Sequence, residues 1–285
     1  MFVLSVLAAG TSARALADRI SDFEGGMSYD NNIGNARFRS DIRGDLALNL
    51  GTSQGVVVQI NDTDSVTLTG DLKGQSFHRF SGMSNLSLGA TLGYRRKIGM
   101  GATAPWLSAS ASAARLKFQN EVRDGWQYAA VIRAGRRVDE NWDLNAEYRF
   151  EKRTGDNANP EVPGISGAVF DLRGHSLGLN AGYAWNDKTL LSMSYSYRAG
   201  DVVSTSRPNA GIFLVSSAIA EDPVFGEGVY AYRLRASTQL VSLRLSQAIS
   251  GNASINLGLQ RQFTHGDGGN TYNTNLVDLS YLYSF

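Results

Sequence analysis

Charged side chains recur at every second position in several segments of this chain, and they are the residues best suited to bind or steer a solute. Acidic and basic groups that share one face of neighbouring strands create strong local fields when that face encloses water. The candidates are Asp71, Lys73, Arg95, Arg133, Glu147, Arg149, Arg198, Arg233, Arg235, Arg244 and Asp278. Two interpretations stay open: the arginines line one wall of a water-filled passage, or they pair with carboxylates and fill the interior.

Catalytic chemistry has weaker support in the sequence. His78, His175 and His265 fall on segments that are not expected to be neighbours, so they do not form a metal site. An imidazole beside a carboxylate, as at His265 and Asp267, can act as a general base, but no serine nucleophile or paired-aspartate motif accompanies it. The segment 99–104 fits the G-x-G-x-x-A dinucleotide pattern, yet a proline and an alternating segment follow it instead of a helix. We therefore expect no catalytic residue, no metal and no cofactor.

The elements that must position the charged residues are β-strands. Apolar residues alternate with polar ones along most of the chain, and a period of two places all the apolar side chains of a strand on one face. A membrane barrel needs this arrangement, with apolar side chains towards lipid and polar ones inside. Twelve such runs extend over residues 23–29, 46–60, 66–72, 86–94, 107–113, 128–134, 142–150, 177–185, 191–197, 230–236, 255–263 and 277–285.

The connections between these runs give an independent check. Five are short and rich in turn residues, near 61–64, 99–101, 139–141, 186–188 and 250–252, and the long ones lie near 154–169 and 201–228. Twelve strands whose two termini share one side need five connections on that side and six on the other. Trp106, Trp142 and Trp185 each lie at a strand end beside a short turn, which predicts an aromatic girdle at the membrane interface.

The last nine residues carry the most specific signal. Val277, Leu279, Tyr281, Tyr283 and Phe285 fall on one face of a strand, and the chain ends on the phenylalanine. This ending resembles the C-terminal sorting signal of Gram-negative outer-membrane β-barrels, which the barrel-assembly machinery recognises. The resemblance implies an outer-membrane barrel with both termini in the periplasm. It also implies lipid and lipopolysaccharide as surroundings and the assembly machinery as a partner during biogenesis.

The N-terminal residues 1–17 are expected to be a secretory signal peptide, because an apolar stretch is followed by small residues that end in an Ala-x-Ala pattern. The barrel domain then comprises residues 18–285. Removal of the signal takes away Arg14 alone and leaves equal numbers of basic and acidic side chains, which argues against a nucleic-acid partner. The chain has no cysteine, so disulfides and thiolate sites are excluded.

The segment 201–228 is too apolar for a mobile surface loop, because it contains Ile212, Phe213, Leu214 and Val215. Three arrangements would bury these side chains. The segment could fold into the barrel mouth as a constriction, dock against an envelope partner or a lipid chain, or pack across the neighbouring loops as a small lid.

These patterns predict an all-β, single-domain, transmembrane, antiparallel up-and-down barrel of about twelve strands. The function we expect is a narrow, porin-like channel for diffusion of small polar or anionic solutes. The main alternative is a non-conducting accessory barrel whose outer loops dock another envelope protein, and an outer-membrane hydrolase is the less favoured one.

Overall fold

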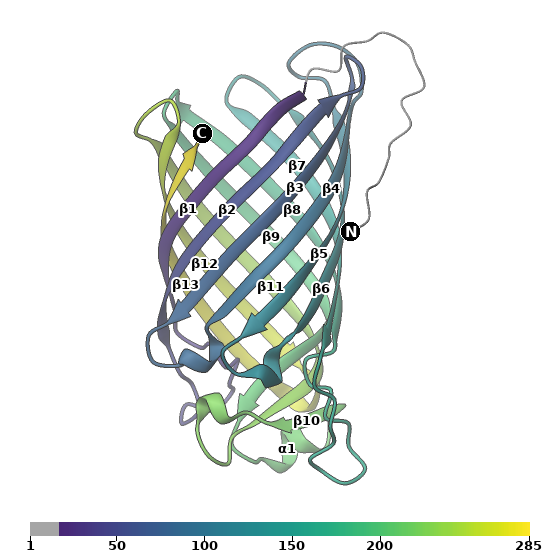
Figure 1. Cartoon of the computed structure of the whole chain (residues 1–285), viewed down its shortest axis with the longest axis vertical. Helices are drawn as coiled ribbons and strands as arrows, with labels where there is room; N and C mark the ends of the chain where they lie inside the picture. The colour runs from purple at the N-terminus through teal and green to yellow at the C-terminus, as the bar shows by residue number, and fades with distance from the viewer. Residues whose placement is uncertain (1–16) are drawn as a thin grey trace, which may run out of the picture.

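The computed structural model describes residues 17–285, in which twelve long antiparallel strands close into a barrel (Figure 1). The strands are β1 (Ala17–Asp30), β2 (Asp45–Gln59), β3 (Asp64–Phe77), β4 (Asn85–Lys97), β5 (Trp106–Phe118), β6 (Gly125–Arg137), β7 (Trp142–Gly155), β8 (Leu172–Asn186), β9 (Thr189–Ser206), β11 (Tyr230–Ala248), β12 (Ala253–Gly266) and β13 (Asn270–Ser284). Each pairs with its neighbours in chain order, β9 pairs with β11, and β13 closes the barrel against β1. The predicted class and strand number are confirmed.

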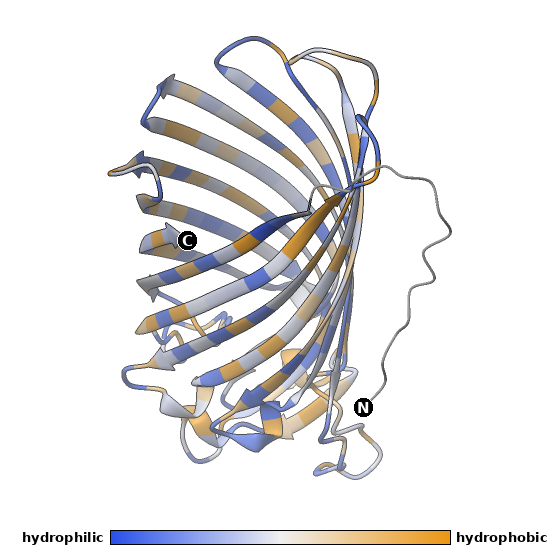
Figure 2. Ribbon diagram, turned by 45° about the horizontal axis from the view of Figure 1, so that its top comes forward, coloured by the Kyte–Doolittle hydropathy of each residue, from blue (hydrophilic) through white to orange (hydrophobic). Residues whose placement is uncertain are grey.

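The two faces of the wall differ as the alternation predicts. Large apolar side chains point outwards and are exposed, with Leu88 and Leu177 each 64% accessible. Along each strand apolar and polar residues follow one another, which Figure 2 shows as alternating bands of colour. An outer surface of this kind is stable against hydrocarbon rather than water, because burying apolar area in lipid removes it from solvent.

The two ends of the barrel have different connections. Five short connections, at 60–63, 98–105, 138–141, 187–188 and 249–252, lie at the end that also holds the C-terminus, and we call it the turn end. Gly99 and Gly101 have φ angles of 95° and 93°, which only glycine adopts readily, so they shape the tight connection between β4 and β5. The opposite end, here the loop end, carries the six other connections, as the strand count requires.

The connections at the loop end contain six short elements. They are the strand β10 (Ala218–Glu221), the helix α1 (Ala210–Phe213), and the 3₁₀ turns η1 (Ser81–Met83), η2 (Glu121–Arg123), η3 (Pro223–Phe225) and η4 (Asp267–Gly269). Within residues 17–285 no helix is long and apolar enough to span a membrane. The predicted signal peptide falls on residues outside the description, apart from Ala17, which begins β1, and it stays a prediction.

The segment 201–229 forms a compact structure that we call the lid (Figure 1). β9 and β11 continue past the end of β12, which pairs with β11 only as far as Ala236, and β10 takes over that edge of β11 at residues 230–233. Two apolar clusters result, one around Val169 and Phe170 and one around Tyr232 and Leu234. The tightly packed apolar core of this protein therefore lies in the lid and its neighbouring loops.

The lid reaches across to the loops that connect other strands. The amide of Thr205 donates to the carbonyl of Gly34 at 2.7 Å, and the rings of Phe225 and Phe80 stack with centroids 5.1 Å apart. Ile212 and Ile219 of segment 201–228 are thus covered by packing across the neighbouring loops, the third of the three arrangements considered above, whereas Phe213 and Leu214 stay exposed. Its two other uses, as a constriction or a docking surface, stay predictions.

Aromatic side chains form only part of the expected girdle at the turn end. Trp142 and Trp185 share the outward face of their strands, and both contact Tyr183. Trp106 does not belong to this girdle, because the exposed residue beside it on β5 is Leu107, and Trp106 lies on the inner face under Arg95. The girdle prediction is therefore wrong for Trp106: the cation on the neighbouring strand provides its ring with a partner inside the barrel.

Candidate functional site

The inner face of the barrel is lined mainly by small side chains. On β9 the inward positions are Ser192, Ser194 and Ser196, and on β5 they include Ser108 and Ser110. A twelve-strand barrel with large inward residues would be filled, whereas hydroxymethyl and glycine positions leave space for water. Sequence reasoning concentrated on the charged residues and missed this lining, although the serine alternation on β5 and β9 was visible.

A chain of alternating charges follows the β6, β7 and β9 side of this interior. Arg133 Nε lies 2.5 Å from Glu147 Oε2, and Arg149 Nε lies 3.0 Å from Glu147 Oε1. Arg149 Nη1 is 3.4 Å from Glu151 Oε1, and Arg198 Nε is 3.9 Å from Glu151 Oε2. Of the two interpretations, paired charges describe this wall, because Arg133, Arg149 and Arg198 each lie within 4.0 Å of a carboxylate.

Strands β3 and β4 carry three charged groups, Asp71, Lys73 and Arg95, that form no ion pair within 4.0 Å in the described residues. Asp71 accepts a hydrogen bond from Ser53 Oγ at 2.6 Å, and Arg95 covers the Trp106 ring at 4.4 Å from its centroid. Lys73 lines a cavity of about 400 Å³ together with Asp278.

Arg244 Nη2 lies 3.4 Å from Asp278 Oδ2, so this pair bridges β11 and β13 on the inner face. Two glycines make room for charged groups: a Cβ atom at Gly258 would overlap the Asp278 carboxylate, and one at Gly174 would overlap the Arg198 guanidinium. The positions of both charged groups therefore depend on the absence of a side chain on the adjacent strand.

Two predicted lining residues lie elsewhere. On β11 the exposed apolar residues Val241 and Leu243 mark the outer face of the strand. Arg233 and Arg235 lie on this outer face, whereas Arg244 lies on the inner one. Arg233 Nη1 instead donates to the carbonyls of Ala168 and Asp171 in the connection between β7 and β8 at the loop end. Arg235 is exposed. The interior assignment of these two arginines is wrong.

The error has a physical cause. Segment 230–236 was predicted to be membrane-facing because its apolar residues alternate, but Tyr232 and Leu234 are buried under the lid. The part of β11 that faces lipid lies further along the chain, where Val241, Leu243 and Leu245 are exposed. Alternation identifies a buried face and does not say whether lipid or protein covers it.

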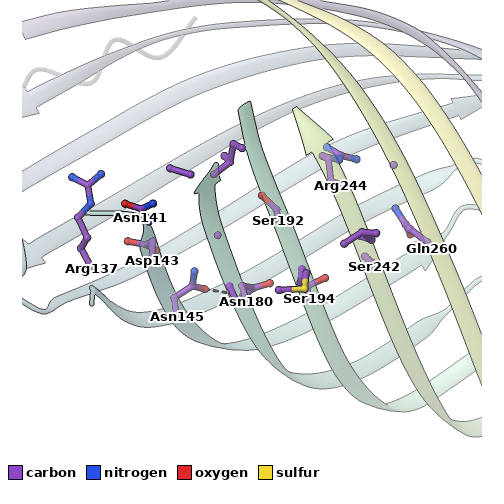
Figure 3. Close-up of a pocket in the computed structure, with 17 residues that line it drawn as sticks. Arg137, Asn141, Asp143, Asn145, Asn180, Ser192, Ser194, Ser242, Arg244 and Gln260 are labelled. Carbon is purple, nitrogen blue, oxygen red and sulfur yellow. Dashed lines mark hydrogen bonds between the residues drawn. The ribbon is translucent and has the colours of Figure 1, made fainter. Parts of the chain in front are cut away.

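Three cavities follow one another through the interior. The turn-end cavity, about 590 Å³, is lined by Arg137, Asp143, Asn180, Ser194 and Arg244 among others, and Figure 3 shows these side chains converging on it. Asn180 Nδ2 donates to Asn145 Oδ1 at 2.8 Å, the dashed line in Figure 3.

The middle cavity, about 320 Å³, shares Asn180 and Ser194 with the turn-end cavity and contains the Glu147–Arg149–Glu151 charges. The loop-end cavity, about 360 Å³, shares Arg198, Thr238 and Gln262 with the middle one. The shared lining residues place the three cavities next to one another, in order from the turn end to the lid.

The loop-end cavity brings together arginines that were not singled out from the sequence. Arg123 from η2 and Arg153 from β7 line it together with Arg198. Arg153 continues the alternation of Glu147, Arg149 and Glu151, so the period of two could have found it. Arg123 follows a turn in a connecting loop, and no local pattern marks it.

The predicted constriction residues have different surroundings from one another. Ile212 is 5% exposed and packs with Val215 in the lid, while Phe213 and Leu214 are 39% and 80% exposed. None of the four lines the three neighbouring cavities.

The C-terminal residues lie on the outer face of β13. Leu279 and Tyr281 are exposed there, and the rings of Tyr283 and Phe285 meet edge to face with centroids 4.8 Å apart. This geometry leaves the predicted sorting signal accessible from the side of the barrel.

The three histidines lie on elements that do not pair with one another: His78 follows β3, His175 is on β8 and His265 is on β12. His175 Nδ1 lies 2.7 Å from the Tyr148 hydroxyl and its ring contacts Phe150, on the outward face of the wall. Residues 17–285 contain no group of three or more His, Cys, Asp or Glu side chains arranged to hold a metal ion.

Comparisons with known proteins agree on the fold. No family model matches the chain, and no curated protein matches it. The COG4313 outer membrane channel from Pseudomonas putida F1 is similar in structure, with a TM-score of 0.60 and 11% identity over 99% of this chain and 100% of that chain. The NanC porin gives 0.46 at 8% identity over 93% and 100%, and the outer membrane channel DcaP of Acinetobacter baumannii gives 0.43 at 11% over 98% and 100%. At 11% identity, the likeness to the Pseudomonas putida channel shows that the two chains share a β-barrel fold.

Proposed function

We propose that this chain is a narrow channel for small polar or anionic solutes in the outer membrane of a Gram-negative cell, with both termini in the periplasm. The observation that carries the proposal is the run of three neighbouring cavities through the interior, lined mainly by polar and charged side chains. Small polar linings leave water in a pore, and fixed charges on its wall bias which ions enter.

The charge chain on β6, β7 and β9 moderates the expected selectivity. Its arginines are paired, so their fields partly cancel and a strong anion preference is not expected from them alone. A weak preference that depends on salt concentration fits this wall better.

A non-conducting accessory barrel is the second candidate, and the lid favours it. The lid covers the loop end and bonds to neighbouring loops, while Leu214 stays 80% exposed on its surface. In this case the outer loops would bind another envelope protein, and lipopolysaccharide would contact the outer face of the barrel. The barrel-assembly machinery is the proposed partner during biogenesis in either case.

Single-channel recording of the folded chain in a planar bilayer separates the two candidates. Ser194 lines both the middle and the turn-end cavities, so Ser194→Trp should lower the conductance by about half or more. Tyr195→Trp is the matched control, because the adjacent side chain faces outwards and is 43% exposed. Discrete current steps that Ser194→Trp reduces and Tyr195→Trp leaves intact support the channel. A folded, heat-modifiable barrel that passes no current supports the accessory candidate.

A further inference from the structure

The loop-end cavity differs from the rest of the interior because basic groups gather around it. It lies where the lid meets the inner wall, and Arg123, Arg153 and Arg198 contribute to its lining from three different elements. At about 360 Å³ it is at the low end of the range of about 300–1,000 Å³ that is typical of small-molecule pockets.

Arg153 is the arginine of this cavity whose positive charge has no carboxylate partner in the part of the chain that the structure describes. Within residues 17–285 no carboxylate lies within 4.0 Å of its guanidinium. Its Nη2 donates to the carbonyl of Arg123 at 2.5 Å, and its Nε is buried without a hydrogen-bond partner. The guanidinium lies 5.2 Å from the ring centre of Phe118 and 5.1 Å from that of Phe170. Aromatic faces hold a cation in place but do not neutralise it.

Arg123 is buried, and only some of its N–H groups have a hydrogen-bond partner. It is 8% exposed and pairs with Asp222, yet its Nε also lacks a partner. Its guanidinium lies 4.8 Å from the ring centre of Phe170, the same ring that Arg153 contacts. A buried N–H group without an acceptor is costly, so an acceptor that enters the cavity would be favoured.

The other charged groups at the cavity do not form an ion pair with Arg153. Arg198 is 3.9 Å from Glu151 and donates to the carbonyl of Asp201 at 3.0 Å. Asp201 also lines the cavity, and its Oδ2 accepts a hydrogen bond from the amide of Arg173 at 2.9 Å. Two of the three arginines thus have a carboxylate within 4.0 Å in the described residues, whereas Arg153 has none and is the guanidinium that a ligand can pair with.

We propose that the loop-end cavity is a binding site for a small carboxylate that also carries hydroxyl groups. Arg153 binds the carboxylate, with Arg123 beside it, because a planar guanidinium matches a carboxylate with two parallel hydrogen bonds. Asn35, Thr205 and Gln262 line the same cavity and supply polar partners for hydroxyl groups. The inference rests on the proposed channel, since it places this site on the solute route just inside the lid, but binding can be measured without any current.

Gluconate is a suitable probe, and glucose is its control, because the two are similar in size and hydroxyl content while only gluconate is charged. Binding is measured by isothermal titration calorimetry on the folded, full barrel domain in detergent at low salt, where charge interactions are least screened. We expect heat of binding with gluconate and none with glucose at the same concentration. Equal binding of both sugars, or no binding of gluconate, overturns the proposal.

Substitutions then locate the site. Arg153→Gln removes the charge and should weaken gluconate binding about tenfold or more, the range for a lost charge-assisted hydrogen bond. Arg235→Gln is the matched control, because Arg235 is an exposed arginine that does not line the cavity. Arg153→Lys keeps the charge without the planar fork and should fall between the two, which provides a second test if Arg153→Gln folds poorly. Unchanged binding in both Arg153 variants overturns the proposal.

The two proposals fail in different ways. Gluconate binding to a barrel that passes no current keeps the site and removes the channel. Current through the barrel without gluconate binding keeps the channel and removes the site.

Discussion

Arg133 on β6 and Glu147 on β7 are direct cross-strand partners, and Arg133 Nε lies 2.5 Å from Glu147 Oε2. Glu147 also accepts from Arg149 Nε at 3.0 Å, so one carboxylate serves two guanidinium groups on the inner wall. Glu147 is therefore the only carboxylate near Arg133 in the described residues, whereas Arg149 also has Glu151 as a partner.

Glu147→Gln should make the channel prefer anions. The substitution keeps the shape of the side chain and leaves Arg133 and Arg149 without their shared counter-charge, so the inner wall becomes more positive. We expect the reversal potential in a salt gradient to shift towards the anion value, with a change in permeability ratio of about twofold or more. Glu140→Gln, in the exposed turn between β6 and β7, is the control. A reversal potential that does not move in Glu147→Gln would show that ions do not pass this wall.

Asp222→Asn should loosen the lid. The ion pair of Arg123 with Asp222 is buried, with side chains 9% and 3% exposed, and Thr205 Oγ1 lies 3.2 Å from Asp222 Oδ2. Removing one partner of a buried pair leaves the other charge uncompensated, at a cost of about 3–5 kcal/mol. We expect faster amide hydrogen exchange in residues 201–229 and faster proteolysis there, while the barrel strands stay protected.

The control for this prediction is Glu227→Gln, which changes an exposed acidic residue of the same lid. Equal exchange in Asp222→Asn and the unsubstituted chain would mean that apolar packing alone holds the lid closed.

The pKa of Asp156 should depend on Arg115. Arg115 Nη1 donates to Asp156 Oδ1 at 2.8 Å, and this hydrogen bond lowers the pKa of the Asp156 carboxyl from its ordinary value of 3.8. Since the folded-state pKa is depressed, the contact stabilises the loop at pH values above the ordinary one and is lost as the pH falls through the folded-state pKa. Arg115→Gln should return the pKa to its ordinary range, measured from the carboxyl carbon shift in an NMR titration. Arg173→Gln should leave the titration unchanged.

Phe285→Ala should slow assembly in the cell while leaving the folded barrel stable. Phe285 is 76% exposed and contacts Tyr283, so little packing is lost with its ring. The proposed sorting signal predicts less heat-modifiable protein in the outer membrane of expressing cells, whereas refolding of the purified chain into detergent should be unaffected. Ser284→Ala, one residue away, should match the unsubstituted chain in both assays. Normal membrane levels of Phe285→Ala would remove the sorting role.

The sequence by itself determined the barrel. Strand number, the alternation of faces and the separation of short from long connections all follow from a period of two and from turn residues, which are local properties of the chain. The pairing of Arg133 with Glu147 was also within reach, because the short turn between β6 and β7 sets the register of that hairpin.

Only the tertiary structure decided what covers each face and what meets inside. Tyr232 and Leu234 alternate as lipid-facing residues would, yet β10, α1 and a distant loop cover them. Arg233 and Arg235 therefore lie on the outer face of β11 and not on the inner face that the alternation predicts. Arg123 and Arg153 meet at one cavity although the whole of β6, a turn and most of β7 separate them in the chain. Such contacts depend on barrel closure and on how the lid crosses the mouth, and no local pattern specifies either.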